Sequence, residues 1–432
     1  MLELFSPEIM SLWLTMAGVP NSLSSLDAIE LTSLQEPPDR EAERMMKHYL
    51  KQLASEGLSE ATQGVWLQSG AKLLATNQGT TPLPAASITK VATTLAALET
   101  WGADHQFETL IAATGPIQNG VLQGDLVIQG GGDPLFDWEE AIALGHSLNQ
   151  IGISRITGNL LIGGNFMMNF EDDRTQSGAL FKQALNSKTW DEDAKAEYEQ
   201  LPNDTPRPTI EIKGAVKVLA GTAPLPKQIL LLRHRSLPLT DLIKRMNVHS
   251  QNEMSQMLAD NLGGVQATIQ KAATAAGVSP AEIRLVNGSG LSLDNRISPR
   301  AACAMFAAID HYIHPRNLTI ADLFPVSGWD HQGTLEDRDL PRAAVVKTGT
   351  LNEVSALTGV LPTRDRGFVW FAIINRGSNI SNLRKQQEGF LKALQQQWGT
   401  MPAPTMIEPS SWVGARRATL GASARNEIVY GG

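Results

Sequence analysis

Three short groups of polar residues follow one another along the chain, and together they carry the side chains of a serine acyl-transfer site. A serine hydroxyl attacks a carbonyl only after a base has taken its proton. A lysine can be that base when burial or nearby positive charge lowers its pKa. In chain order the residues of the three groups are Ser87 and Lys90, then Ser250 and Asn252, then Lys347, Thr348, Gly349 and Thr350.

Two serine-x-x-lysine sequences occur in the chain, and the elements predicted around them separate the two. Ser69 and Lys72 fall across the turn of a predicted β-hairpin, where their side chains have no fixed relation. Ser87 and Lys90 open a predicted helix, and residues three apart share a helix face. The unpaired N–H groups and the dipole at a helix start also favour a developing oxyanion. We therefore predict that Ser87 is the nucleophile and Lys90 its base.

The second and third groups supply what this pair lacks. Ser250 would pass a proton to the leaving amine, and Asn252, in or beside a predicted helix over 239–262, would orient Lys90 and a substrate amide. Lys347 follows an apolar strand, and its charge would lower the pKa of Lys90.

The residues around Gly349 predict a substrate-binding strand edge. Gly349 removes a side chain where a substrate backbone could lie alongside the strand. Lys347 and Thr348 could bind a substrate carboxylate. The Thr350 N–H could pair with that of Ser87 as an oxyanion hole.

Each group alone has a plainer structural explanation. Ser87 could be a helix N-cap, Ser250 and Asn252 part of an exposed helix surface, and Lys347 the end of an ordinary strand. The required order of all three groups, on suitable elements, favours the catalytic interpretation.

The elements that position these groups predict an α+β domain with an insertion. Helical patterns cover 41–56 and 382–398, and paired strands are predicted over 354–361 and 367–374. The first and last strands are far apart in sequence, yet we expect them to share one antiparallel sheet. The predicted ranges are 1–40 as a leader or N-terminal extension, 41–104 and 236–400 as the two parts of the main domain, 105–235 as a smaller β-rich inserted domain, and 401–432 as a flexible tail.

The composition narrows the classes of protein and site. With 432 residues, 42% of them hydrophobic and 19% charged, the chain predicts a globular protein of more than one domain. Its formal net charge of −8 argues against a nucleic-acid partner, which needs a basic patch. The single cysteine, Cys303, excludes an intrachain disulfide and a cysteine-based zinc site. His311 and His314 have no third ligand candidate nearby, so we expect no metal and no cofactor.

The N-terminal apolar stretch bears on targeting. Ile9–Val19 is long enough for the apolar region of a signal peptide but too short to span a bilayer, and Glu3 and Glu8 stand where a basic start is expected. A cleaved leader, an interfacial anchor and a plain terminal helix all stay open. We expect membrane contact at most through this segment.

Several further segments resemble the low-molecular-mass class C penicillin-binding proteins, the D-alanyl-D-alanine carboxypeptidase/endopeptidases of peptidase family S13. Residues 83–90 are similar to that family's nucleophile segment, and 124–134 to a glycine-rich strand and turn of its inserted domain. Residues 287–291 and 330–335 resemble two more family segments. The resemblance covers about 41–400.

The resemblance implies a fold, an activity and a location. The fold would be a penicillin-recognising transpeptidase/β-lactamase-like domain, with a five-stranded antiparallel sheet flanked by helices. The enzyme would trim peptidoglycan stem peptides ending in D-Ala-D-Ala, in the periplasm or cell envelope, and β-lactams would inhibit it. Ser87 would form the acyl-enzyme and Lys90 would be its base, Ser250 and Asn252 would assist, and Lys347, Thr348 and Thr350 would bind substrate.

The chain departs from the family pattern, and two other functions compete with the enzyme. The stretch between Lys90 and Ser250 is shorter than the family's two-domain insertion, and Gln251 replaces a residue that is often aspartate or another small polar one. A penicillin-binding scaffold or sensor with little turnover stays open. A class A β-lactamase is disfavoured, because Glu282 and Asn287 do not match the spacing of its deacylating loop.

Overall fold

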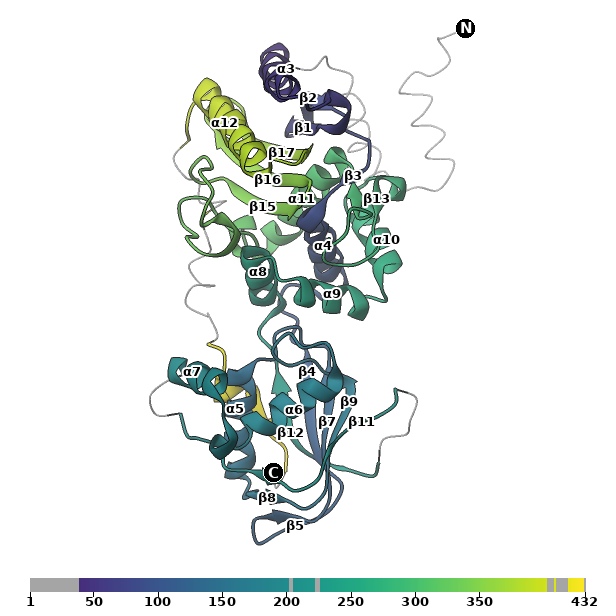
Figure 1. Cartoon of the computed structure of the whole chain (residues 1–432), viewed down its shortest axis with the longest axis vertical. Coiled ribbons are helices and arrows are strands. Elements are labelled where there is room, and N and C mark those ends of the chain that lie inside the picture. Colours follow the sequence, from purple (N-terminus) through teal and green to yellow (C-terminus); the bar gives the residue numbers. More distant parts are fainter. Residues whose placement is uncertain (1–38, 202–204, 222–225, 402–407, 409–418, 431–432) are drawn as a thin grey trace.

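The computed structural model describes residues 39–201, 205–221, 226–401, 408 and 419–430, and Figure 1 shows two lobes stacked along the long axis. The apolar stretch Ile9–Val19 of the predicted leader or N-terminal extension (1–40) lies outside these residues. None of the helices within the described ranges is long and apolar enough to cross a bilayer.

The upper lobe is built on one five-stranded antiparallel sheet. Its first strand pairs with its last along the chain, with Gly64 opposite Ile374, as the sequence predicted. Strand β16 (Val354–Thr363) is buried along its whole length, since helices cover both faces of the sheet. In sheet order the strands are β15 (Val345–Leu351), β16 (Val354–Thr363), β17 (Gly367–Arg376), β1 (Gly64–Ser69) and β2 (Lys72–Asn77).

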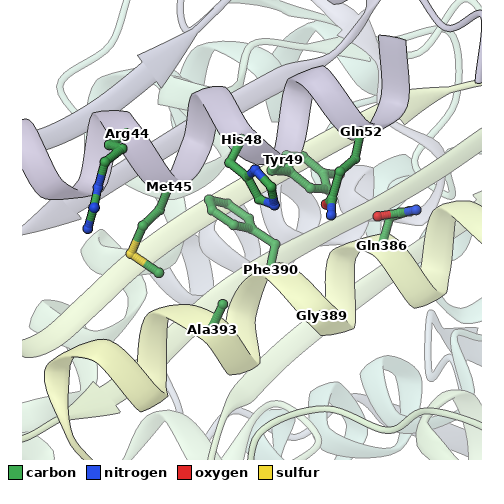
Figure 2. Close-up of a pocket in the computed structure, with 9 residues that line it drawn as sticks. All are labelled: Arg44, Met45, His48, Tyr49, Gln52, Gln386, Gly389, Phe390 and Ala393. Carbon is green, nitrogen blue, oxygen red and sulfur yellow. The ribbon is translucent and has the colours of Figure 1, made fainter. Parts of the chain in front are cut away.

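Two helices cover one face of this sheet. In α3 (Arg40–Ser55) the Asp39 side chain caps the first turn by accepting from two backbone N–H groups. In α12 (Ile380–Trp398) the apolar face packs on the sheet. Figure 2 shows the two helices side by side, with Tyr49 stacked on Phe390 at a ring separation of 4.6 Å.

The other face carries the larger core, with a buried helix at its centre. Ten residues of α4 (Thr89–Trp101) are buried, and this helix packs against α10 and α11. A three-stranded sheet of β13 (Ile283–Arg284), β14 (Arg296–Ile297) and β3 (Leu83–Pro84) lies beside the start of α4. The remaining helices of this layer are α8 (Leu239–His249), α9 (Asn252–Asn261), α10 (Val265–Ala275) and α11 (Pro299–Ile313).

The lower lobe has its own hydrophobic core, drawn from residues between Ile111 and Leu232. The lobe contains two sheets and the helices α5 (Trp138–Gln150), α6 (Arg174–Ala184) and α7 (Glu192–Gln200). The larger sheet has the order β11 (Val216–Val218), β9 (Leu160–Asn165), β7 (Leu126–Gly131), β4 (Glu108–Ala113), β12 (Ile229–Arg235) and β18 (Asn426–Ile428). The smaller sheet has the order β10 (Glu211–Ile212), β8 (Arg155–Ile156), β6 (Val121–Leu122) and β5 (Ile117–Gln118).

The prediction of a flexible tail over 401–432 is wrong for residues 419–430. Strand β18 pairs antiparallel with β12, with Leu232 opposite Ile428, and forms an edge of the lower sheet. Just before this strand, the Arg425 guanidinium pairs with the buried Glu140 carboxylate. Next to it, Asn426 Oδ1 lies 2.7 Å from Nδ1 of the buried His234. These partners come from distant parts of the chain, so the short tail sequence gives no sign of them.

Arg425→Ala should destabilise the protein by about 1.5–3 kcal/mol, the range for a lost hydrogen bond to a charged group, because it leaves Glu140 buried without its cation. Chemical denaturation of the full chain measures the change. Arg376→Ala is the matched control, since its pair with Glu353 is about half exposed and should contribute less than about 1 kcal/mol. Equal losses in the two variants would show that the buried pair does not hold the C-terminal strand.

Candidate active site

Ser87 lies where the chain turns into the central helix. It sits in the 3-10 turn Ala86–Ile88, which continues into α4, so Lys90 follows in the first turn of that helix. Ala86 has a positive φ of 47°, a strained conformation for a residue with a side chain. The backbone around it is crowded, since a Cβ on Gly290 would lie 2.0 Å from the Ala86 carbonyl oxygen. This packing fixes the direction of the Ser87 side chain.

The Lys90 amine is buried and makes three contacts. Its Nζ donates to Asn252 Oδ1 at 2.8 Å and to the Ser289 carbonyl at 2.7 Å, and it lies 3.1 Å from Ser87 Oγ. The first two partners are carbonyl oxygens, which can only accept. In a neutral amine the two N–H groups therefore donate to these two oxygens, and the lone pair faces the Ser87 hydroxyl. That is the arrangement a general base requires.

Burial is the main reason why both lysines of the site bind their protons weakly. Burial lowers the pKa of Lys90 to about 7, although the negative charge of Glu253 acts in the opposite direction. Burial also holds the pKa of Lys347 well below its usual range, and the charge of Lys90 lowers it further. A substantial share of Lys90 is therefore neutral near pH 7.

Ser250 and Asn252 occupy a corner between two helices. The single helix predicted over 239–262 is in fact α8 and α9, separated at Ser250, whose backbone is left-handed at φ 56° and ψ 41°. The break brings Ser250 Oγ to 3.1 Å from Lys347 Nζ, while Asn252, the first residue of α9, reaches Lys90. The corner thus connects the two lysines.

Lys347 faces the interior of the site. Its side chain is fully buried, and its Nζ donates to Ser250 Oγ and, at 2.9 Å, to the Thr348 carbonyl. The structure therefore does not support the predicted role of Lys347 as a direct ligand of a substrate carboxylate. Burial holds the pKa of Lys347 well below its usual range, so its other predicted role, that of a positive charge that lowers the pKa of Lys90, stays a prediction.

The outer edge of β15 presents backbone groups to the nucleophile. Upstream, Val346 N–H donates to Pro325 and the Ala344 carbonyl accepts from Ser327, so these even-numbered residues turn their polar groups away from β16. Because this direction repeats every second residue, the Thr350 N–H faces the same edge. Gly349 lets Ser87 approach, since a Cβ there would lie 3.0 Å from the Ser87 nitrogen. The outer edge of β15 thus lies close to Ser87, and the oxyanion pair of the Ser87 and Thr350 N–H groups stays a prediction.

One participant that the sequence reasoning did not identify is the Ser289 carbonyl. Its loop is held by hydrogen bonds, in which Thr93 and Ser255 donate to the Gly288 carbonyl and Gly290 N–H donates to Asn287 Oδ1. The segment 287–291 resembles a family segment, but a contact through a backbone carbonyl leaves no side-chain signature in the sequence.

A groove of about 600 Å³ adjoins the site on the side of the lower lobe. Asn252 and Ser289 line it beside Lys90, and Phe166, Asp172 and Arg174 line it from the lower lobe. The groove is lined by both polar and apolar side chains.

Other candidate groups do not join this site. The Glu282 carboxylate accepts from Ser298 Oγ at 2.6 Å and pairs with Arg300, so it has no path to the nucleophile as a deacylating base. Cys303 is buried in α11. Within the described parts of the chain, no group of three or more His, Cys, Asp or Glu residues could hold a metal ion.

Relatives with similar sequences are carboxypeptidases. A carboxypeptidase from Mycobacterium tuberculosis is 25% identical over an alignment of 342 residues, and the match covers 68% of this chain and 71% of that one. D-alanyl-D-alanine carboxypeptidase DacB from Haemophilus influenzae is 24% identical over 398 residues, 68% of this chain and 81% of the relative. A carboxypeptidase from Mycolicibacterium smegmatis is 28% identical over 162 residues, which span only 35% of its length.

Solved structures confirm the predicted fold. A penicillin G-acylated predatory endopeptidase from Bdellovibrio bacteriovorus, in complex with an immunity protein, has a TM-score of 0.67 and 21% identity over 81% of this chain and 97% of that one. Penicillin-binding protein 4 from Haemophilus influenzae has a TM-score of 0.59 and 21% identity over 81% and 98%. At these identities the likeness concerns the fold.

The family assignment rests on a match over most of the chain. The family model describing D-Ala-D-Ala carboxypeptidase 3 (S13) matches residues 46–178 and 176–397. This range contains all three polar groups and both lobes, and the family predicted from the motifs is confirmed. The chain belongs to the D-Ala-D-Ala carboxypeptidase 3 (S13) family.

Proposed function

We propose that the chain is a serine-type D-Ala-D-Ala carboxypeptidase that trims peptidoglycan stem peptides through an acyl-enzyme on Ser87 and is acylated by β-lactams. The observation that carries this proposal is the buried Lys90 amine, 3.1 Å from Ser87 Oγ with both other contacts to carbonyl oxygens. Family membership supports the substrate class.

Acylation follows from the contacts of the two lysines. Neutral Lys90 takes the proton of Ser87 as Oγ forms a bond to the carbonyl carbon of the penultimate D-alanine. The N–H groups of Ser87 and Thr350 stabilise the oxyanion. As the C–N bond breaks, the leaving amine takes the hydroxyl proton of Ser250, and the proton that Lys90 took from Ser87 passes to Ser250, so that Lys90 is neutral again.

Deacylation reverses these roles. Water takes the place of the departed D-alanine, and neutral Lys90 accepts a proton from it as the water oxygen attacks the ester carbonyl. The bond to Ser87 Oγ breaks, and the proton returns to that oxygen. Each turnover thus leaves Ser87 and Lys90 as they began.

The substrate would lie between β15 and the corner at Ser250. An extended peptide can pair with the outward backbone groups of β15, with its scissile carbonyl at the oxyanion pair. The rest of the stem peptide would enter the groove lined by Asn252, Phe166 and Arg174. Since this substrate occurs in the bacterial envelope, we place the chain in the periplasm or cell envelope.

Ser87→Ala should abolish both covalent labelling by a fluorescent penicillin and D-alanine release from a muropeptide pentapeptide. Gel fluorescence and chromatography of the released D-alanine measure the two. Ser69→Ala is the matched control, since Ser69 belongs to the other serine-x-x-lysine sequence and donates to the Arg366 carbonyl. Labelling of Ser87 without D-alanine release would favour a scaffold or sensor, and labelling of Ser87→Ala would contradict the assignment of the nucleophile.

The rate of acylation should rise with pH through about 7, because Lys90 must lose its proton to act as a base and its pKa is lowered to about 7. Below that pH the ammonium form dominates and the rate should fall about tenfold per pH unit. Stopped-flow measurement with a chromogenic β-lactam gives this profile.

Glu253→Gln should move the same profile to lower pH. The Glu253 carboxylate stabilises the Lys90 ammonium, and its removal lowers the pKa of Lys90 further. A shift to higher pH, or a flat profile in the unchanged protein, would contradict Lys90 as the base. Glu60→Gln, an exposed change in the short helix Glu60–Thr62 before β1, should leave the profile where it is.

A further inference from the structure

A buried cluster of ionisable side chains lies where the C-terminal strand joins the lower lobe, and the mechanism above uses none of its members. Asp133 belongs to the turn after β7, Glu140 to α5 and His234 to β12, and all three are buried. The C-terminal segment, yellow in the lower lobe of Figure 1, adds two partners. Arg425 pairs with Glu140, and Asn426 contacts His234. The cluster thus connects the strand to three elements of the lobe.

Three polar atoms of this cluster point toward one another without a hydrogen bond. His234 Nε2 lies 3.7 Å from Glu140 Oε2 and 4.0 Å from Asp133 Oδ2. None of these three atoms has a hydrogen-bond partner among the described residues. The other oxygen of each carboxylate is already engaged, since Asp133 Oδ1 accepts from the Leu135 N–H at 2.9 Å and Glu140 Oε1 pairs with Arg425. Three buried acceptors in one place call for a shared proton.

The hydrogen bonds of the imidazole show where that proton is missing. Asn426 Nδ2 donates to Ser147 Oγ at 3.2 Å, so Asn426 Oδ1 is the atom that accepts from His234 Nδ1–H, at 2.7 Å. A neutral imidazole with its hydrogen on Nδ1 has a bare lone pair on Nε2. That lone pair faces two carboxylate oxygens, which can only accept unless a carboxyl is protonated. One proton, on a carboxyl or on the imidazole, turns this repulsion into attraction.

The charges of the cluster lead to the same count. Asp133 and Glu140 are two carboxylates, and the guanidinium of Arg425 is the cation that acts on both. One negative charge would stay buried without compensation unless the cluster held a proton. Burial raises the pKa of Asp133 to about 7 and that of Glu140 to about 8, although the charge of Arg425 acts in the opposite direction. Burial lowers the pKa of His234 to about 4, so the proton resides mainly on a carboxyl.

Two further groups act on Glu140. The Gly421 N–H of the C-terminal segment donates to its carboxylate, and the charge of Glu139 raises its pKa. Burial also raises the pKa of Glu139, to about 7, but the other charged groups that act on Glu139 lie outside the C-terminal segment. They are Asp137, Glu197 and Arg245. Glu139 is therefore a buried carboxyl beside the cluster whose charged neighbours do not belong to the strand.

We propose that Asp133, Glu140 and His234 share one buried proton, and that this proton makes the docking of the C-terminal strand β18 on the lower lobe depend on pH. When the strand leaves, Arg425 and Asn426 leave with it and water reaches the carboxyls, which then hold a proton only below about pH 4. The stabilisation by the proton is therefore complete below about pH 4 and is lost as the pH rises through about 7. The strand is held most firmly in acid. This inference does not depend on the proposed function.

Hydrogen exchange of the full chain, followed by mass spectrometry, tests the proposal. The amides of Val429 and Tyr430 donate to the Leu231 carbonyl while the strand is docked, so their exchange reports its opening. After correction for the intrinsic pH dependence of exchange, the opening constant should rise about tenfold per pH unit between about pH 5 and about pH 7, the slope for one released proton, and level off above about pH 8. An opening constant that does not change with pH would overturn the proposal.

Two isosteric variants locate the proton. Asp133→Asn and Glu140→Gln each leave one carboxylate for the one guanidinium, so each should make the opening constant nearly independent of pH over the same range. Glu139→Gln is the matched control and should keep the tenfold slope. If Asp133→Asn or Glu140→Gln keeps the slope of the unchanged protein, the proton is not shared by this cluster and the proposal fails. If one of the two does not fold, as judged by circular dichroism, the other carries the comparison.

Discussion

The burial of two lysines in one site is the constraint on which the rest of the structure depends. Lys90 and Lys347 are both fully buried, and the hydrogen-bond partners of their amines are hydroxyl and carbonyl oxygens. Desolvation disfavours their charged forms and makes Lys90 a base near neutral pH. Two buried amines are stable only where the N–H groups that they keep find hydrogen-bond acceptors. The neighbouring elements supply those acceptors.

The acceptors come from three separate segments of the upper lobe, which must therefore meet at the two lysines. Asn252 comes from the start of α9, the Ser289 carbonyl from the loop before β14, and Ser250 from the left-handed residue between α8 and α9. The short pairing of β3 with β14 holds that loop beside the start of α4. Ala86 and Ser250 both have a strained backbone with positive φ, and they lie beside or within the predicted catalytic residues. Backbone strain of this kind is typical of active sites.

The lower lobe reaches the same site through α9. Asn252 begins this helix, and Asn261 ends it against the lower lobe, where it donates to the Gly132 carbonyl at 2.9 Å and accepts from Asn165 at 2.6 Å. One ten-residue helix therefore links the lower lobe to the amide that orients Lys90. After α12 completes the upper lobe, the C-terminal strand β18 returns to the lower lobe and pairs there with β12. The inserted lower lobe therefore contacts the helix that begins with the active-site residue Asn252.

The sequence by itself determined those parts of the protein that depend on local spacing. Ser87 and Lys90 could be paired because a helix places residues three apart on one face, and the strands near both ends of the main domain could be recognised as apolar runs separated by turn residues. The tertiary structure decided the contacts made between distant segments: the break at Ser250, the Ser289 carbonyl on Lys90, the return of β18 to the lower lobe, and Arg425 on Glu140. It also showed that the Lys347 side chain is enclosed, with its Nζ 3.1 Å from Ser250 Oγ. The physical reason is that a backbone carbonyl, a left-handed residue or a partner hundreds of residues away leaves no periodic pattern in the chain, whereas a shared helix face does.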